Sequence, residues 1–237
     1  MSRSQDVILI TGANRGIGLA LSKILLTRNV QVIAAARNPD APSLKALERE
    51  FPTQLMRIGL NVTSDESTQQ AFLALARNVD RLDVVVNMAG IMSRPHDQPL
   101  EKLDLSQCTE SFETNALGPL RVTRAALPLL RNSPRARVVN VTSGCGRLTI
   151  KDNGEFYAYA ASKAALDMMT LTCAFEFKAE GICFVALDPG WVRTDLGGPD
   201  ADLAPEQSAT AIADTIAKLD PSWTGKLLYN DGTELSW

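Results

Sequence analysis

The feature that most constrains this chain is a short apolar run that ends in a glycine-rich turn. Residues 7–10 are continuously apolar, as a strand buried on both faces of a sheet requires, and glycines follow at positions 12, 16 and 18. A helical pattern then runs over residues 19–26. In such a unit the backbone N–H groups and the helix N-terminus face an anion, and glycines let a pyrophosphate approach. A tight turn without a ligand is the alternative, since a glycine turn alone is weak evidence.

The rest of the chain alternates apolar runs with helical patterns. This alternation implies βαβ units and a parallel sheet. We find no second core, linker or further repeat, so we expect one doubly wound α/β domain over residues 1–237. The predicted further strands are 30–36, 54–60, 82–86, 138–142, 182–187 and 226–229, and the predicted helices are 43–50, 65–79, 105–130, 159–180 and 205–219.

Composition excludes several classes of function. The apolar content of 45% is ample for a core, whereas a net charge of −3 argues against a nucleic-acid surface, which needs clustered cations. The four cysteines form no C-x-x-C pair, so we expect neither a zinc site nor a disulfide framework. The single histidine, His96, lies in a proline-rich stretch typical of an exposed loop, and we do not expect it to act as a general base.

No segment predicts secretion or membrane insertion. The first apolar run is far shorter than a secretory signal, and no uncharged apolar run is long enough to span a bilayer. We therefore expect a soluble, cytoplasmic protein without membrane or nucleic-acid partners.

A basic residue ends the second predicted strand. Arg37 stands about twenty positions after the last glycine of the turn, where a dinucleotide-binding domain faces the adenosine ribose. An acidic residue there would bind the 2′-hydroxyl of NAD, whereas Arg37 and Arg15 offer two cations to a 2′-phosphate. The pattern favours NADP(H) over NAD(H); a pair of solvated surface arginines is the alternative.

Tyr159 and Lys163 lie four positions apart in a helical segment, so both side chains leave one face. A phenol has an ordinary pKa of about 10, and a nearby cation favours the phenolate. The pair therefore suits a proton donor to a carbonyl oxygen. An ordinary helix face is the alternative. Tyr157 precedes this pair, but only Tyr159 has a lysine four positions on.

Two further polar side chains, Ser143 and Asn115, occupy positions that are typical of a ligand-binding or catalytic site. Ser143 follows a predicted strand directly, at the edge where open α/β sheets bind ligands, and residues 144–156 read as a loop over that site. Asn115 interrupts a long helical stretch close to Pro119, which lacks an N–H donor, so we expect a bend with a freed carbonyl there. A tolerated imperfection of an ordinary helix is the alternative for Asn115.

The order and spacing of these motifs resemble those of the short-chain dehydrogenases/reductases over essentially the whole chain. Within that family the chain looks most like the sniffer-type carbonyl reductases and the C-factor-like proteins, because of the long interval from Ser143 to Tyr159, residues 189–198 and the ending 232–237. The resemblance rests on Thr11-Gly-x-x-x-Gly16-x-Gly18, Asn87-Met-Ala-Gly90, Asn115, Ser143, Tyr159-x-x-x-Lys163 and Pro189-Gly190.

The resemblance implies a Rossmann fold with strand order 3-2-1-4-5-6-7, helices on both faces, and the family's site roles. Tyr159 would be the acid/base, Ser143 the donor that polarises the carbonyl, Lys163 the ribose ligand that lowers the phenol's pKa, and Asn115 the holder of a water. Asn61 replaces the usual acidic residue at the adenine, and Met88 replaces the second Asn of the usual motif. The implied cofactor-binding residues are Gly12, Asn14, Arg15, Gly16, Ile17, Gly18, Arg37, Asn61, Val62, Asn87, Ala89, Gly90, Tyr159, Lys163, Pro189, Gly190, Val192 and Thr194.

The leading functional hypothesis is an NADPH-dependent reductase of ketones or aldehydes. The alternatives are a dinucleotide-binding signalling protein of C-factor type with incidental turnover, and a biosynthetic ketoreductase, which would need a basic patch at the mouth of the site. The short loop 196–203 suggests an open site for varied small carbonyl substrates. Family members commonly pair through the helices that carry Asn115 and Tyr159, so we expect a homodimer or homotetramer. Apolar side chains at several angles over residues 164–169 agree with that expectation.

Overall fold

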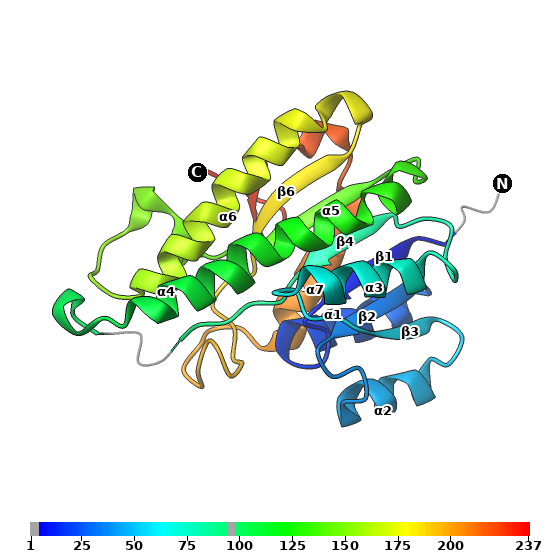
Figure 1. Ribbon diagram of the computed structural model, residues 1–237, viewed down its shortest axis with the longest axis horizontal. Helices are drawn as coiled ribbons and strands as arrows, with labels where there is room; N and C mark the ends of the chain where they lie inside the picture. Colours follow the sequence, from blue (N-terminus) through cyan, green and yellow to red (C-terminus); the bar gives the residue numbers. More distant parts are fainter. Residues whose placement is uncertain (1–4, 94–97) are drawn as a thin grey trace.

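The structure, a computed structural model, describes residues 5–93 and 98–237, and within these ranges a sheet of eight strands forms the centre (Figure 1). The strand order is β3-β2-β1-β4-β5-β6-β7-β8, and every neighbouring pair is parallel except β7 with β8. The predicted order of the first seven strands is confirmed. The strands are β1 (Val7–Thr11), β2 (Gln31–Ala36), β3 (Leu55–Gly59), β4 (Val84–Asn87), β5 (Arg137–Val141), β6 (Cys183–Asp188), β7 (Lys226–Tyr229) and β8 (Glu234–Leu235).

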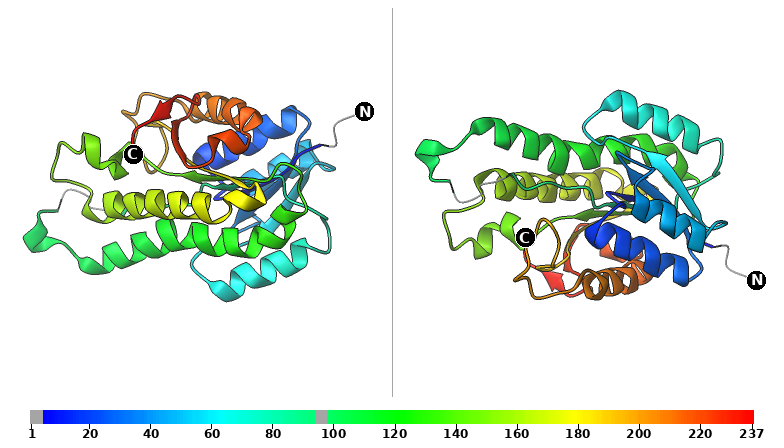
Figure 2. Two further views of the ribbon diagram at one scale, coloured as in Figure 1. Left: turned by 90° about the horizontal axis from the view of Figure 1, so that it is seen from above. Right: turned by 90° about the horizontal axis from the view of Figure 1, so that it is seen from below.

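Helices cover both faces of the sheet (Figure 2). Successive residues of β1 show why: Ile8 and Ile10 belong to the core shared with α1, α2 and α7, whereas Leu9 belongs to the core shared with α3, α5 and α6. A strand buried on both sides reads as an unbroken apolar run, which is what the sequence predicts. The helices are α1 (Gly16–Thr27), α2 (Pro42–Glu50), α3 (Asp65–Leu75), α4 (Leu105–Phe112), α5 (Gly118–Arg131), α6 (Tyr157–Glu176) and α7 (Pro205–Lys218).

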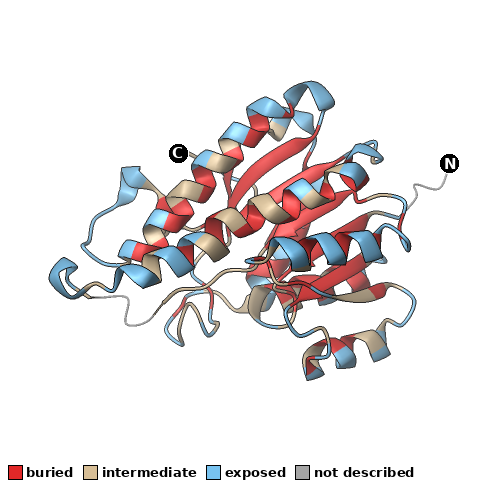
Figure 3. Cartoon of the chain, viewed as in Figure 1, coloured by how far each residue is buried: buried red, intermediate tan, exposed pale blue. Residues whose placement is uncertain are grey.

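Burial follows the same layers (Figure 3). The central strands are buried along their length, and the outward faces of the helices are exposed. No helix within the described ranges is both long and apolar enough to cross a membrane.

The helical stretch around Asn115 bends as predicted. A π-helical turn, Glu113–Leu117, joins α4 to α5, and Pro119 stands at the start of α5. Because a proline has no N–H to donate to the carbonyl four residues earlier, the regular helix cannot continue through Asn115. The long helix predicted over residues 105–130 is therefore two helices separated by one wide turn.

Three other sequence predictions need correction. The helix predicted to residue 79 ends at Leu75, because Val79 packs in the core after a turn and does not continue the helix. The helix predicted to residue 180 ends at Glu176, and a 3₁₀ turn, Lys178–Glu180, completes it before Gly181 at φ +71°. The two-residue strand β8 was not expected, because so short an edge strand carries no periodicity.

Candidate active site

A cavity of about 1700 Å³ opens at the carboxyl ends of the parallel strands. The segments that follow β1, β2, β3, β4, β5 and β6 all contribute to its lining. This edge of a doubly wound sheet is where connections diverge to opposite faces and leave a crevice. Among the described residues no group of three or more His, Cys, Asp or Glu side chains is placed to hold a metal ion.

The glycine turn after β1 has no room for side chains. Gly12 adopts φ +68°, and a Cβ there would lie 2.9 Å from Cα of Ala89; a Cβ on Gly18 would lie 2.5 Å from the carbonyl oxygen of Gly12. Thr11 holds the facing segment, because its Oγ1 accepts hydrogen bonds from the N–H groups of Met88 and Ala89, both at 3.0 Å. The turn and the loop after β4 thus form one close-packed floor, so these glycines are required by contact as well as by backbone conformation.

Two arginines stand at the predicted adenosine end of the cavity. Arg37 lines it and makes no hydrogen bond or ion pair with any residue of the described chain. Arg15 lines it as well, and its Nη1 pairs with Oδ2 of Asp195 at 2.7 Å. Asn61 also lies here, with its Oδ1 accepting from the N–H and hydroxyl of Thr63 at 3.2 and 2.9 Å. The oxygen of the amide that replaces the usual acid is therefore engaged in its own turn.

Ser143 and Tyr159 meet at the other end of the cavity. Ser143 follows β5 and Tyr159 lies in the first turn of α6; the Ser143 hydroxyl lies close enough to the phenol to lower its pKa. Tyr159 is 8% exposed and lines the cavity. Tyr157 is 41% exposed and does not line it. The structure therefore separates the two tyrosines as the sequence predicts.

Lys163 lies one helical turn after Tyr159 and is buried. Its Nζ donates to the carbonyl oxygen of Val141 at 2.8 Å and stands 5.7 Å from the centroid of the Tyr159 ring. Burial lowers the pKa of Lys163 to about 8. Burial also raises the pKa of Tyr159 above its ordinary value of 10, although the nearby Ser143 hydroxyl lowers it in part. The expected lowering of the phenol's pKa by Lys163 stays a prediction, since Lys163 is not among the groups that shift the pKa of Tyr159 here.

Asn115 ties the active helix to the loop after β4. Its Oδ1 accepts from the N–H of Ile91 at 2.8 Å, and its Nδ2 donates to the Ile91 carbonyl at 2.8 Å and to Oγ of Ser162 at 3.0 Å. Both amide hydrogens are thus used. A Cβ on Gly90 would lie 3.3 Å from Oδ1 of Asn115, so the loop passes close against it. The side chain fixes the loop, and a water at this residue would have to bind its main chain.

Every other implied cofactor-binding residue lines the cavity, but Asn87 does not. Its side chain is 2% exposed and points into the protein, where Nδ2 donates to Oδ1 of Asn140 at 2.8 Å and to Oγ1 of Thr123 at 3.2 Å. The side chain of Asn87 therefore faces away from the cavity, and the placement of this residue beside the cofactor stays a prediction. Asn115 also lies outside the lining. His96 lies outside the described residues.

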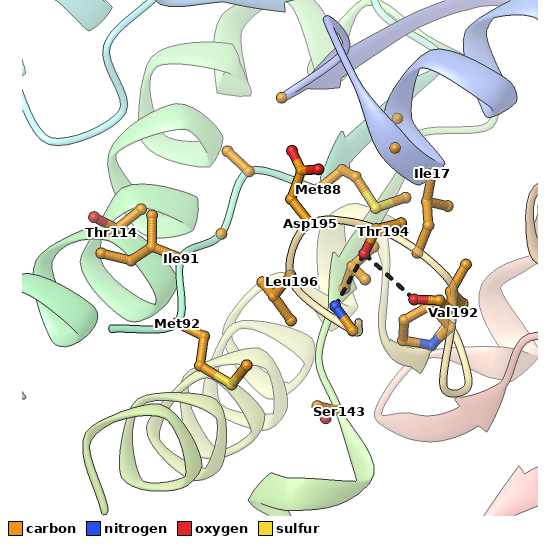
Figure 4. A pocket seen from close by; sticks show the side chains of 18 of the residues that line it. Ile17, Met88, Ile91, Met92, Thr114, Ser143, Val192, Thr194, Asp195 and Leu196 are labelled. Atoms are coloured by element: carbon orange, nitrogen blue, oxygen red, sulfur yellow. Dashed lines mark hydrogen bonds between the residues drawn. The ribbon is translucent and has the colours of Figure 1, made fainter. Parts of the chain in front are cut away.

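The segment after β6 is held by its own hydrogen bonds. Thr194 Oγ1 donates to the carbonyl of Val192 at 3.3 Å and accepts from the N–H of Gly197 at 3.1 Å (Figure 4). Gly190 adopts φ +80°, and a Cβ on it would lie 2.8 Å from Oη of Tyr229. Pro189, Gly190, Val192 and Thr194 all line the cavity, as predicted.

Several lining residues were not predicted individually. Asp188 ends the apolar strand β6, and its Oδ1 accepts from the N–H of Gly190 at 2.9 Å. Burial raises the pKa of Asp188 above its ordinary value. A carboxylate at the end of an otherwise apolar strand is the signal that could have identified it. Cys145, Phe156 and Trp191 also line the cavity, but only the fold brings them there.

A buried carboxylate next to Lys163 supplies a test of stability. Asp167 is 7% exposed and its Oδ1 has no hydrogen-bond partner in the described chain. Burial raises the pKa of Asp167 from 3.8 to about 6, although Lys163 lowers it in part. Because the folded state then binds more protons than the unfolded state between those values, wild-type stability falls as pH rises from about 4 to about 6.

We therefore expect Asp167→Asn to stabilise the fold by about 1–3 kcal/mol at pH 7 to 8, with the gain disappearing near pH 4. Urea unfolding across this range measures it. Glu110→Gln, an exposed carboxylate, is the control and should change stability little at any pH. A constant difference between wild type and Asp167→Asn from pH 4 to 8 would contradict the assignment.

The sheet order and the cavity at its carboxyl edge define a doubly wound α/β protein with a ligand-sized crevice. The chain belongs to the short-chain dehydrogenase family, since the model of that family, described as short chain dehydrogenase, matches residues 6–202. The predicted family is thereby confirmed.

The chain is similar to carbonyl reductases and also to a protein named as a signal. The chain is similar to the carbonyl reductase Sniffer of D. melanogaster, with 30% identity and a TM-score of 0.92 over 98% of this chain and 100% of that one. It is similar to an NADPH-bound carbonyl reductase from chicken fatty liver, with 28% identity and a TM-score of 0.90 over 98% and 99%. It is also 41% identical to the C-signal of Myxococcus xanthus over 166 residues, which span 69% of this chain and 99% of that protein.

Proposed function

We propose that this protein is an NADPH-dependent carbonyl reductase in which Tyr159 donates the proton to the nascent alkoxide. The observation that carries the proposal is that Ser143 and Tyr159 lie close together in one cavity, which begins at the glycine turn. The likeness to carbonyl reductases supports the substrate class, and the NADPH of the chicken enzyme supports the cofactor.

The cavity suits a dinucleotide at both ends. The glycine turn at the start of α1 presents backbone N–H groups to a pyrophosphate. Arg37, which has no ion-pair partner among the described residues, offers its cation to a 2′-phosphate. Lys163 would contact the ribose of the cofactor. Val192 and Thr194 would contact the carboxamide of its nicotinamide. When bound, the dihydronicotinamide supplies the hydride that adds to the carbonyl carbon.

The protein's own groups handle the oxygen of the substrate. The Ser143 hydroxyl donates a hydrogen bond to the carbonyl oxygen and Tyr159 transfers its proton as negative charge develops there. The raised pKa of Tyr159 keeps the phenol protonated at neutral pH, which is the state that a donor needs. The phenolate that remains lies near the Lys163 ammonium, one helical turn away, and this positive charge stabilises it.

The arginines give a test of cofactor preference. We expect NADPH to bind more tightly than NADH by about 1–3 kcal/mol, because charge-assisted bonds to a phosphate are worth about that much. Arg37→Ala should remove most of this difference, since Arg15 already pairs with Asp195, and the double change of Arg15 and Arg37 to Ala should abolish it. Fluorescence titration with both dinucleotides measures it.

Arg28→Ala is the matched control, because Arg28 pairs with Asp214 away from the cavity. Equal affinity of the wild type for both dinucleotides would refute the cofactor assignment. A panel of ketones, aldehydes and quinones, followed by NADPH absorbance, tests the reaction itself. Absence of turnover with all three classes would refute the proposed function.

A second candidate is a dinucleotide-binding signalling protein, favoured by the likeness to the C-signal. A protein that only binds has no need of the Ser143–Tyr159 pair, and its action would survive loss of the phenol. Replacement of Tyr159 therefore separates the two candidates.

We also infer a homodimer or homotetramer that forms through α4, α5 and α6. Met168 and Phe175 on α6 are 65% and 71% exposed, and Leu105 on α4 is 69% exposed, so these helices present large apolar side chains on their outer surface. Sedimentation at micromolar concentration should give a multiple of 25.6 kDa. A single species of monomer mass would contradict this inference.

A further inference from the structure

Two non-glycine residues in the described chain have a positive φ: Asn29 at 62° and Phe156 at 64°. Asn29 follows α1, and asparagine tolerates this left-handed conformation because its side chain hydrogen-bonds locally. Phenylalanine gains no such compensation, and its Cβ approaches the following carbonyl oxygen. The backbone at Phe156 is therefore strained, and the surrounding structure must hold it.

Phe156 occupies the position before α6, three residues ahead of Tyr159. Its carbonyl oxygen accepts from the N–H of Ala160 at 2.7 Å, which fixes the peptide at the start of the helix. Its side chain is half-buried and lines the cavity. A residue with ordinary φ would send its Cβ in a different direction, so the strain decides where the ring lies.

A lysine braces the segment that leads to this ring. Nζ of Lys151 donates to Oδ1 of Asn153 at 2.7 Å and to the carbonyl of Glu155 at 2.8 Å, and it lies 5.9 Å from the centroid of the Phe156 ring. The N–H of Glu155 donates to the same Asn153 oxygen at 3.2 Å. These contacts close residues 151–156 into a small turn that keeps the ring in position.

The ring shares the cavity with other apolar side chains. Ile91 and Met92 come from the loop after β4, and Leu196 comes from the loop after β6 (Figure 4). All three line the cavity together with Phe156 and Tyr159. These apolar side chains line the same cavity as Ser143 and Tyr159, so the cavity offers them to the substituents of a carbonyl bound there.

We propose that Phe156 is a specificity-determining residue, whose ring forms an apolar wall for the non-reacting substituent of a neutral aryl or bulky alkyl ketone. This inference rests on the proposed carbonyl reduction. Backbone strain persists at functional sites when the neighbouring structure over-determines it, and here the turn at Lys151 supplies that constraint. Removal of the ring should weaken recognition of the substituent and leave the proton donor in place.

The first arm of the test compares acetophenone with acetone, using NADPH. In Phe156→Ala the ratio of kcat/KM for acetophenone to that for acetone should fall about tenfold or more, the loss expected when a hydrophobic pocket loses a contact. Phe156→Leu, which keeps an apolar side chain, should retain most of the ratio. The affinity for NADPH should be unchanged in both variants. An unchanged ratio in Phe156→Ala overturns the proposal.

The second arm of the test measures the backbone strain at Phe156 by thermal unfolding of variants. Phe156→Gly should unfold at a temperature about 2 °C or more above that of Phe156→Ala, because both lack the ring and only glycine adopts the left-handed conformation freely. Asn29→Gly and Asn29→Ala should show the same order of stability without any change in the ketone ratio. Equal stability of the two Phe156 variants would overturn the role of strain in holding the wall.

A binding measurement separates this inference from the proposed function. Acetophenone binding can be followed by the fluorescence of Trp191, which also lines the cavity. If the wild type binds acetophenone but reduces no carbonyl, the proposed reductase function is refuted. The apolar wall at Phe156 is still supported in that case if Phe156→Ala binds acetophenone at least tenfold more weakly than the wild type. Equal binding by Phe156→Ala and wild type overturns the wall, whatever the turnover.

Discussion

Tyr159→Phe should lose carbonyl reduction by a factor of about 10² to 10⁴ or more, while the fold and NADPH binding survive. The change removes a single hydroxyl and keeps the ring of a residue that is 8% exposed. General acid catalysis is worth that range of rate. Steady-state kinetics with one good ketone substrate, together with an NADPH titration, measures both quantities.

Tyr157→Phe is the matched control, because it makes the same change two residues earlier on an exposed side chain outside the cavity. It should retain wild-type turnover. Near-normal reduction in Tyr159→Phe together with its loss in Tyr157→Phe would show that the wrong tyrosine has been assigned. If the wild type shows a signalling activity that Tyr159→Phe retains in full, this result supports the dinucleotide-binding signalling protein, the second candidate function.

Lys163→Met should weaken both turnover and dinucleotide affinity. The methionine keeps the unbranched stem in the buried site but loses the ammonium that donates to Val141 and lies near the Tyr159 ring. We expect the affinity for NADPH to fall about tenfold or more, because a hydrogen bond from a charged group is worth about 1.5–3 kcal/mol. Lys178→Met, an exposed residue after α6, is the control.

The pH profile distinguishes this role from simple packing. Because burial lowers the pKa of Lys163 to about 8, the wild type loses the ammonium as pH rises through that value, and reduction should decline there. Lys163→Met has no such group, so its residual activity should lack this decline. If the activity of Lys163→Met also declined as pH rises through about 8, the decline could not be assigned to Lys163.

Tyr159 and Lys163 show how much of the site could be predicted from the sequence. The spacing of Tyr159 and Lys163 predicts one helix face, and both side chains are indeed buried on α6. Their electrostatics did not follow from spacing. Desolvation depends on what covers a side chain, and here it raises the pKa of the phenol and lowers that of the lysine.

Local sequence determined the elements that carry a periodic pattern or a special backbone requirement. The unbroken apolar runs predict strands buried on both faces, the glycines of the first turn predict a close approach, and Pro119 predicts the bend at Asn115. These features depend on residues within a few positions of one another, so the sequence contains the information directly.

Only the tertiary structure decided which side chains face the cavity. Asn87 belongs to a motif but turns inward to Asn140, 53 residues away, because two neighbouring strands place the amides side by side. Phe156 carries no motif, yet a left-handed backbone and the turn held by Lys151 direct it to the site. Side-chain direction at such positions is set by partners distant in sequence or by an uncommon φ, and neither leaves a periodic signal in the chain.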